Sequence, residues 1–332
     1  MRVDHIIDCR QGVYAPYVAI SEKGWLMEGK IRMLPVTVLP KDPPSSPSFN
    51  VCMSPLYGNR SHNALLLLQF IEHHRHIGAQ HLFVYVYQLT DRATRAILDF
   101  YASINVITVI PIKRNDSDHN ACITHADCRI RATVQDCILR SVNRFKYTAA
   151  IDMDELIVPL KHQSVLEMLS VLDVHYAGES LFSAFMFRPR WVNLADDGPN
   201  ADQLISQIAN SGKLDDFVWQ NLPAFRYHNT TQPAPPIFIA KCIVKPDQIA
   251  YMGIHIVHYK VHQAGQQDYI GGTYQVDPTN AYIRHFRIVD PTMFGQPELT
   301  DIPADNTLHQ RVLAGLTMIR TKLMETNSTQ CR

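Results

Sequence analysis

The chain has 332 residues, 46% of them hydrophobic, which is enough for one large α/β domain or two smaller domains with a buried core. Lysine and arginine together number 31, and so do aspartate and glutamate, so the formal net charge is zero. A balanced charge excludes a whole-molecule field that attracts nucleic acid or an anionic membrane. We therefore expect no nucleic-acid partner, and an anionic ligand must be met locally by a metal or by a few side chains.

The sequence also lacks the features of a membrane or targeting segment. No apolar run reaches the roughly 18 residues that a membrane-spanning helix needs. The first five residues, Met-Arg-Val-Asp-His, include charges where a signal sequence would have its apolar core. We expect no membrane segment in the chain as given, which fits a soluble protein or the catalytic portion of an anchored one.

The first 47 residues are predicted to be a leading β-rich segment with a linker. Residues 13–20 and 30–39 have the composition of strands. Residues 40–47, Pro-Lys-Asp-Pro-Pro-Ser-Ser-Pro, cannot continue a helix or a central strand. We therefore expect a catalytic domain over residues 48–325, followed by a tail at 326–332.

From residue 49 onward, short apolar strands alternate with amphipathic helices. The predicted strands are 49–53, 81–87, 105–111 and 147–151, and the predicted helices are 63–77, 92–101 and 125–144. This succession favours a parallel sheet with helices on its faces. The later elements are a helix at 164–172, a strand at 181–187, an irregular polar region of weak periodicity at 193–220, strands at 236–244 and 249–259, and a helix at 307–323. The expected fold class is α/β, a Rossmann-like and mostly parallel sheet with mixed or antiparallel additions in the C-terminal half.

The run Asp152-Met153-Asp154-Glu155 carries the clearest chemical signal, because it ends the apolar strand 147–151. A spacing of two places Asp152 and Asp154 on one face of an extended chain. Two carboxylates at the edge of a core repel each other unless a cation lies between them, and Mg²⁺ and Mn²⁺ prefer carboxylate ligands. In open α/β sheets, ligands bind at the carboxyl ends of the strands. The run therefore predicts a metal site that could neutralise a leaving diphosphate, although a solvated loop has the same pattern.

The acidic run, followed by Leu-Ile-Val-Pro, resembles glycosyltransferase family 92. Further motifs of the resemblance are 52–57, 70–72, 78–85, 135–137, 241–246, 252–255 and 284–287. The resemblance implies an inverting enzyme of the GT-A fold that uses Mn²⁺ (or Mg²⁺) and a UDP-sugar, usually UDP-galactose. It implies a glycan or glycoprotein acceptor, including fucose on N-glycans, and a Golgi or secretory-pathway lumen. Family members are typically anchored in the membrane, and no anchor is visible here.

The resemblance also implies roles for residues of the metal site. Asp152 is expected to meet the donor ribose or a metal-bound water, and Asp154 to ligate the metal. A histidine from a late strand often completes the metal shell in GT-A enzymes. His255 is the first candidate and His285 the second, with a satisfied core histidine as the alternative for each. Phe286 stands where the family often has tyrosine, so a hydroxyl group is missing there.

Other residues are expected to contact the donor. Asp136 is expected to orient the donor sugar, with an ion pair to Arg140 four residues later as the alternative. Glu72 is expected to reach the base or to face solvent. The end of the first strand is expected beside the uracil and ribose, and it comprises Ser54, Pro55 and Leu56.

An inverting transfer needs a carboxylate that takes the proton of the acceptor hydroxyl. By the position that the resemblance implies, Asp215 and Asp216 are the first candidates and Asp196 and Asp197 the next. Acidic pairs of this kind can equally be solvated. Three other functions are considered. A phosphotransferase of the haloacid-dehalogenase kind would need another residue at Leu156, and a retaining glycoside hydrolase needs carboxylates on separate elements. A non-catalytic glycan-binding relative is the third.

Seven cysteines leave at least one thiol free or paired with another chain. Cys122 and Cys128 bracket a short loop and are a candidate disulfide, with buried reduced thiols as the alternative. A secretory-pathway lumen is favoured by four Asn-x-Ser/Thr sequons, at Asn59, Asn115, Asn229 and Asn327.

Overall fold

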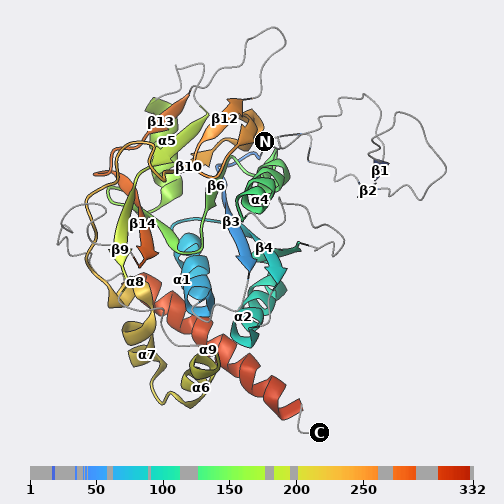
Figure 1. Cartoon of the computed structure of the whole chain (residues 1–332), viewed down its shortest axis with the longest axis vertical. Coiled ribbons are helices and arrows are strands. Elements are labelled where there is room, and N and C mark those ends of the chain that lie inside the picture. Colours follow the sequence, from blue (N-terminus) through green and yellow to red (C-terminus); the bar gives the residue numbers. More distant parts are fainter. Residues whose placement is uncertain are drawn as a thin grey trace.

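The structure is a computed structural model of the whole chain (Figure 1). It describes residues 17–18, 34–35, 40, 42, 44–57, 63–88, 91–112, 126–175, 183–194, 201–260, 272–288 and 306–329. Within these ranges, a seven-stranded sheet forms the centre and a three-stranded sheet lies beside it. In the leading segment, β1 (Tyr17–Val18) and β2 (Leu34–Pro35) form a short antiparallel pair.

The central sheet has the strand order β13-β8-β10-β6-β3-β4-β5. Its neighbouring parallel strands are β6 (Tyr147–Ile151), β3 (Phe49–Tyr57), β4 (His81–Gln88) and β5 (Ile107–Pro111). The added strands are β10 (Lys241–Val244), β8 (Ala184–Phe187) and β13 (Thr273–Gln275). Only β10 runs against its neighbours, because it is antiparallel to both β6 and β8 while β13 is parallel to β8. The expected fold class, a mostly parallel sheet with an antiparallel addition from the C-terminal half, is confirmed.

Helices cover both faces of this sheet. Successive side chains of a strand point to opposite faces, so Val51 and Met53 belong to one buried cluster and Cys52 to another. On the first face lie α1 (Asn63–His76), α2 (Arg92–Ser103), α5 (Val165–His175) and α9 (Asn306–Thr329). The second face is covered by α4 (Ala126–Ser141) and by the hairpin of β11 (Ile249–Met252) and β12 (Val257–Lys260). In Figure 1, α9 crosses below α1 and α2 and leads to the C-terminus.

The acidic run joins the central sheet to the smaller one. The chain leaves the central sheet at the end of β6 and enters the second sheet at Glu155, the first residue of β7 (Glu155–Pro159). In this sheet β14 (Ala281–Arg287) is antiparallel to β7 and parallel to β9 (Pro189–Asn193). Residues 152–154 therefore span the boundary between two sheets.

A disulfide that the sequence did not predict links Cys52 of β3 to Cys137 of α4, with Cα atoms 5.9 Å apart. The alternative of buried reduced thiols is wrong for these two residues. Cys242 is free and buried. The predicted pairing of Cys122 with Cys128 involves a residue outside the described ranges.

Three predictions for the second half of the chain are wrong in detail. The strand expected at 236–244 begins only at Lys241, because residues 236–239 form turns after two consecutive prolines. The strand expected at 249–259 is a hairpin of two short strands. The polar region expected to be irregular contains α6 (Ala201–Asn210) and α7 (Leu214–Asn221), followed by the short α8 (Pro223–Arg226).

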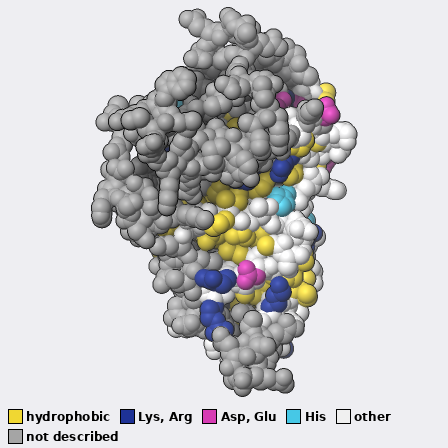
Figure 2. Space-filling model, turned by 90° about the vertical axis from the view of Figure 1, so that its right-hand side faces the viewer, with side chains coloured by type: hydrophobic (Ala, Val, Ile, Leu, Met, Phe, Trp, Pro, Cys, Tyr) yellow, Lys and Arg dark blue, Asp and Glu magenta, His cyan; other side chains and the backbone are white. Residues whose placement is uncertain are grey.

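The surface carries charges of both signs. Figure 2 shows the face to the right of Figure 1, where hydrophobic side chains gather across the middle and basic side chains surround an acidic one lower down. This mixture agrees with the balanced composition of the chain. Among the described helices, none has the length and apolar character that crossing a membrane requires.

Candidate active site

Strand register brings two residues of distant segments to the acidic run. Cys242 lies opposite Ala150, so Lys241 comes next to the end of β6. In the small sheet, His285 of β14 lies opposite Glu155 of β7. Both cationic side chains therefore reach the acidic run because of backbone pairing.

Lys241 neutralises two of the three acids. Its Nζ lies 2.6 Å from Oδ2 of Asp152 and 3.3 Å from Oε2 of Glu155. The Lys241 side chain is 1% exposed and that of Glu155 is fully buried. Glu155 Oε2 also accepts a hydrogen bond of 2.9 Å from the backbone N–H of Asp152. A buried charge persists only when it is paired in this way, so the three groups form a fixed unit.

Asp152 is held as an anion. Burial raises the pKa of Asp152, but Lys241 and the hydroxyl of Ser54, which donates to Oδ1, outweigh burial and leave the pKa at about 2. Burial raises the pKa of Glu155 to about 7, against the effect of Lys241. Both oxygens of Asp152 have a protein partner, and its side chain is still 31% exposed.

A bulge in β3 directs Ser54 towards Asp152. The register of β3 against β4 shifts between Met53 and Leu56, which spans Ser54 and Pro55. Proline within a sheet is found at bulges because it lacks a backbone N–H. Leu56 is 3% exposed and packs in the core, so of the three residues predicted near the nucleotide only Ser54 contacts the acidic run.

Asp154 and His285 form a second pair within the site. His285 Nε2 lies 3.3 Å from Oδ2 of Asp154, and the backbone N–H of Phe286 donates to the Asp154 carbonyl at 2.8 Å. Burial lowers the pKa of His285, but Asp154 and Glu155 raise it above the usual value overall. The Asp154 side chain is 34% exposed, so it can reach a ligand.

The side of the His285 ring away from Asp154 faces Glu155. His285 Nδ1 and Glu155 Oε1 are 3.5 Å apart, and within the described part of the chain neither atom has a hydrogen-bond partner. A metal-ligating histidine commonly turns its second nitrogen to a carboxylate. Glu155 therefore lies where the supporting carboxylate of a metal-ligating histidine is found.

His255 also lies near this cluster, in the turn between β11 and β12. Its Nδ1 donates to the Ala240 carbonyl at 3.1 Å, which leaves Nε2 as an acceptor. Burial and then the charge of Lys241 lower its pKa, and Asp152 and His285 are close enough to affect it. His255 is consequently a neutral imidazole with a free ligand nitrogen.

The Asp154–His285 pair fits a divalent cation better than the Asp152–Asp154 pair does. Neighbouring ligands of an octahedral cation, with bonds of about 2.1 Å, lie about 3 Å apart, close to the separation of Oδ2 and Nε2. Asp152 is already engaged by Lys241 and Ser54. Among the described residues, no three His, Cys, Asp or Glu side chains gather closely enough to hold a metal alone. The remaining ligands of a cation here can come from water or from a bound substrate.

Two predicted donor contacts are engaged by neighbouring side chains. Asp136 accepts hydrogen bonds from Tyr85 at 2.7 Å and from Arg140 at 2.6 Å, which is the ion pair considered as the alternative. Its side chain is 42% exposed. Glu72 is 3% exposed and is bound by Arg75 and by the hydroxyl of Tyr101, so it serves the packing of α1 against α2.

The predicted proton acceptors lie in or near α7. Asp215 and Asp216 are in its first turn, and Asp215 lies 3.6 Å from His309 of α9. Asp196 and Asp197 fall outside the described residues. Lys241 was not predicted as a site residue from the sequence. The signal that could have identified it is a lone cation at the start of the apolar strand Lys-Cys-Ile-Val.

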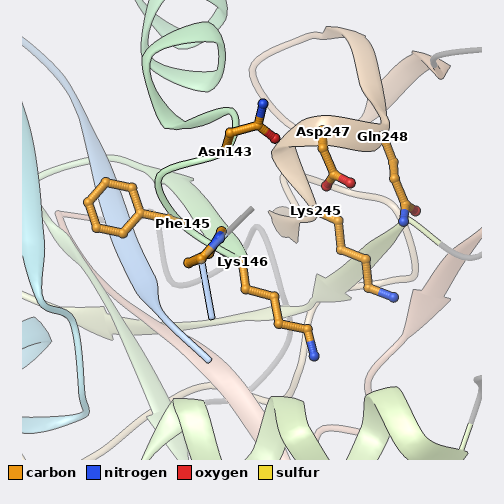
Figure 3. Close-up of a pocket in the computed structure, with 7 residues that line it drawn as sticks. Asn143, Phe145, Lys146, Lys245, Asp247 and Gln248 are labelled. Atoms are coloured by element: carbon orange, nitrogen blue, oxygen red, sulfur yellow. The ribbon is translucent and has the colours of Figure 1, made fainter. Parts of the chain in front are cut away.

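A pocket of about 260 Å³ lies at the opposite end of the strands (Figure 3). It is lined by Pro44, Asn143, Phe145, Lys146, Lys245, Asp247 and Gln248. Lys146 directly precedes β6 and Lys245 directly follows β10, so the pocket is at the amino end of β6. Both lysines pair with Asp173, at 2.8 and 2.5 Å. The pocket therefore offers no free pair of cations and is distinct from the acidic run.

Comparison with known proteins points to one family. The family model described as glycosyltransferase family 92 matches residues 48–318. The β-1,4-galactosyltransferase galt-1 of Caenorhabditis elegans is 29% identical over 129 residues, which cover 37% of this chain. The match spans 28% of that relative's length.

Solved structures with a similar arrangement are distant. TarS (1–349) of S. aureus has 14% identity and a TM-score of 0.30, over 45% of this chain and 37% of that chain. The glucosyl-3-phosphoglycerate synthase of Mycobacterium tuberculosis, solved with Mg²⁺ and UDP, has 8% identity and a TM-score of 0.30, over 83% of this chain and 80% of that chain. Likenesses this weak say nothing about the ligands of this chain.

Proposed function

This chain belongs to glycosyltransferase family 92, and on that premise we propose that it is a metal-dependent, inverting enzyme. It transfers galactose from UDP-galactose to a glycan acceptor, with fucose on N-glycans as the acceptor class. The named activity of the partial relative supports galactose as the sugar. The catalytic domain extends over residues 48–325, of which the family match covers 48–318.

The observation that carries the proposal is the Asp154–His285 pair at the end of β6. Ligands of open α/β sheets bind at this end of the strands, and the pair has the donor atoms and spacing that Mn²⁺ or Mg²⁺ uses. When bound, the cation would neutralise the charge of the leaving diphosphate. His255, with its free Nε2, is the alternative histidine ligand.

The chain's own residues prepare this site. Glu155 supports the imidazole of His285 from the side away from Asp154. Lys241 fixes the carboxylate of Asp152, whose exposed edge is available to the donor ribose. Because these charges are buried and paired before a substrate arrives, little reorganisation is needed during transfer.

We place the base that accepts the acceptor's proton on α7, at Asp215 or Asp216. The support is indirect: α7 leads into α8, and the Ala224 carbonyl of α8 accepts a hydrogen bond of 3.2 Å from Arg284, next to His285. This hydrogen bond ties α8, and through it α7, to the small sheet that carries His285. Aspartate is a suitable base because the hydroxyl proton moves only as the new bond forms.

An oxidising compartment is the proposed location, specifically the lumen of the Golgi or of the secretory pathway. The Cys52–Cys137 disulfide supports it, since disulfides are rare in reducing compartments. The four sequons are compatible with the same location.

The test is Asp154→Asn, assayed by UDP release from UDP-galactose with Mn²⁺ and by Mn²⁺ binding in electron paramagnetic resonance. We expect a loss of turnover of about 100-fold together with weakened Mn²⁺ binding. The melting temperature should hold, because Asp154 is partly exposed. Asp247→Asn, a matched change in the remote pocket, should alter neither quantity. If Asp154→Asn binds Mn²⁺ and turns over like the parent, the proposal is wrong.

A further inference from the structure

The segment 235–240, just before β10, forms two consecutive tight turns. The N–H of Phe238 donates to the Pro235 carbonyl at 3.2 Å, and the N–H of Ala240 donates to the Ile237 carbonyl at 3.5 Å. Ile237 and Ile239 each occupy the third position of a turn, with φ of 71° and 50°. Glycine or asparagine normally fills such a position, and a β-branched residue there is an outlier.

The side chains of this strained turn are also unusually exposed. Ile237 is 61% exposed and Phe238 is 42% exposed. Backbone strain of this kind persists only where the surroundings enforce it, and it concentrates at ligand-binding sites. Glycine would form this turn without strain. The presence of exposed apolar side chains at strained positions therefore indicates that these side chains have a function.

The base of the turn is firmly anchored. Arg188 donates from Nε to the Ala234 carbonyl at 2.5 Å and from Nη2 to the Pro233 carbonyl at 3.2 Å. On the other side, the Ala240 carbonyl accepts from His255. The turn is therefore tied on one side to Arg188 and on the other to His255, a candidate metal ligand.

Aromatic contacts place Phe238 close to the metal pair. The ring centroid of Phe238 lies 6.4 Å from that of Trp191, and Trp191 lies 6.4 Å from the ring of His285. Trp191 itself is only 2% exposed, so it cannot meet a ligand face to face. Phe238 is the exposed member of this series of rings. Ser54 and Asp152, the proposed donor contacts, lie in other segments of the chain.

We propose that Phe238 is the platform on which a sugar ring of the acceptor glycan stacks, held at the site by the strained turn 235–240. The inference rests on the proposed transfer to a glycan, and it names Phe238 as the residue that binds the acceptor. The negative face of an aromatic ring attracts the weakly positive C–H groups of a sugar face, and the apolar surface is desolvated in the contact. The strain keeps the ring in one orientation.

The experiment is saturation-transfer difference NMR with the methyl glycosides of fucose, galactose, mannose and N-acetylglucosamine, on the full chain with UDP and Mn²⁺. At least one glycoside should receive saturation at its ring C–H protons. Phe238→Ala should weaken that binding about tenfold, whereas Phe238→Trp should retain it. Phe145→Ala, which removes an aromatic ring at the remote pocket, should leave the signal unchanged.

The platform is refuted if no glycoside receives saturation from the parent, if Phe238→Ala binds as the parent does, or if Phe145→Ala weakens binding equally. Acceptor-independent release of UDP from UDP-galactose separates this result from the proposed function. Phe238→Ala should keep that release within about twofold of the parent, because the ring contacts the acceptor and not the donor. If the parent releases no UDP but binds glycosides through Phe238, the catalytic proposal fails and the platform stands.

Discussion

Replacing Lys241 by methionine tests whether the acidic run depends on a buried counter-charge. Lys245→Met is the matched control, because Lys241 begins β10 and Lys245 directly follows this strand. Lys241 is 1% exposed and contacts two carboxylates, whereas Lys245 is 17% exposed and pairs with an aspartate that keeps a second lysine. Methionine has nearly the length of the lysine stem, so packing changes little.

The expected magnitudes differ because burial differs. Removing one partner of a buried ion pair costs about 3–5 kcal/mol. Asp152 is 31% exposed and can be partly rehydrated, so we expect about 3 kcal/mol for Lys241→Met, chiefly from the fully buried Glu155. A pair that remains partly solvated contributes about 1 kcal/mol or less, which sets the expectation for Lys245→Met.

Urea denaturation followed by circular dichroism gives both free energies of unfolding, with tryptophan fluorescence as a check on two-state behaviour. Donor affinity should fall in Lys241→Met, because the carboxylate of Asp152 loses its fixed position, and should hold in Lys245→Met. Equal stability losses in the two variants would show that the counter-charge of Lys241 is not what stabilises the acidic run.

Three further predictions concern the scaffold. Replacing both Cys52 and Cys137 by alanine should lower the free energy of unfolding by about 4–5 kcal/mol, from chain entropy over the 85-residue separation. Gly315→Ala should destabilise by about 1–3 kcal/mol although alanine favours helices, because the new Cβ would lie 2.5 Å from the Tyr101 hydroxyl. The stabilising effect of Asp173, measured as parent minus Asp173→Asn, should be full at pH 7 and be lost progressively as the pH falls below about 4 and through the folded pKa. Burial raises that pKa, but hydrogen bonds from Lys146, Lys245 and Tyr147 outweigh burial and lower it.

Denaturation curves check all three, each with its own control. Reducing agent should have no effect on the variant that lacks Cys52 and Cys137 but should lower the stability of the parent. Gly212→Ala should be harmless, since a Cβ there meets no atom within 4 Å. The reasoning on Asp173 is refuted if the stability difference grows as the pH falls, because a group with a lowered folded pKa stabilises only while ionised.

The parallel half of the fold follows from the sequence because its signals are local. Strands such as Tyr147–Ile151 are short, apolar and flanked by amphipathic helices, so their type and order are readable. β10 and β14 were not placed in a sheet by the sequence, because their partners are distant in the chain. The turn at 236–239 was mistaken for a strand, since Ile-Phe-Ile has the composition of one and only its tertiary position explains it.

The candidate site, like the fold, could be predicted from the sequence only where its signals are local. Asp152 and Asp154 stand out because carboxylates seldom end a buried strand, and His285 was a candidate by its late position. The role of Lys241 depends on the antiparallel pairing of β10 with β6, which no local pattern encodes. The hydrogen bond from Tyr101 to Glu72 likewise depends on how α1 packs against α2. The sequence alone therefore could not show that this carboxylate has a partner within the protein.

Because the acidic run joins the two sheets, the Asp154–His285 pair forms only when the strands of the small sheet pair in the correct register. Ala281 pairs with Pro159 at one end of β14, and His285 pairs with Glu155 nearer the other. A slip of one residue would turn the imidazole to the opposite face while leaving the large sheet and most helices intact. Such a misaligned chain would have an almost native circular dichroism spectrum but no ligand pair, so preparations of this protein are best judged by metal binding rather than by secondary structure.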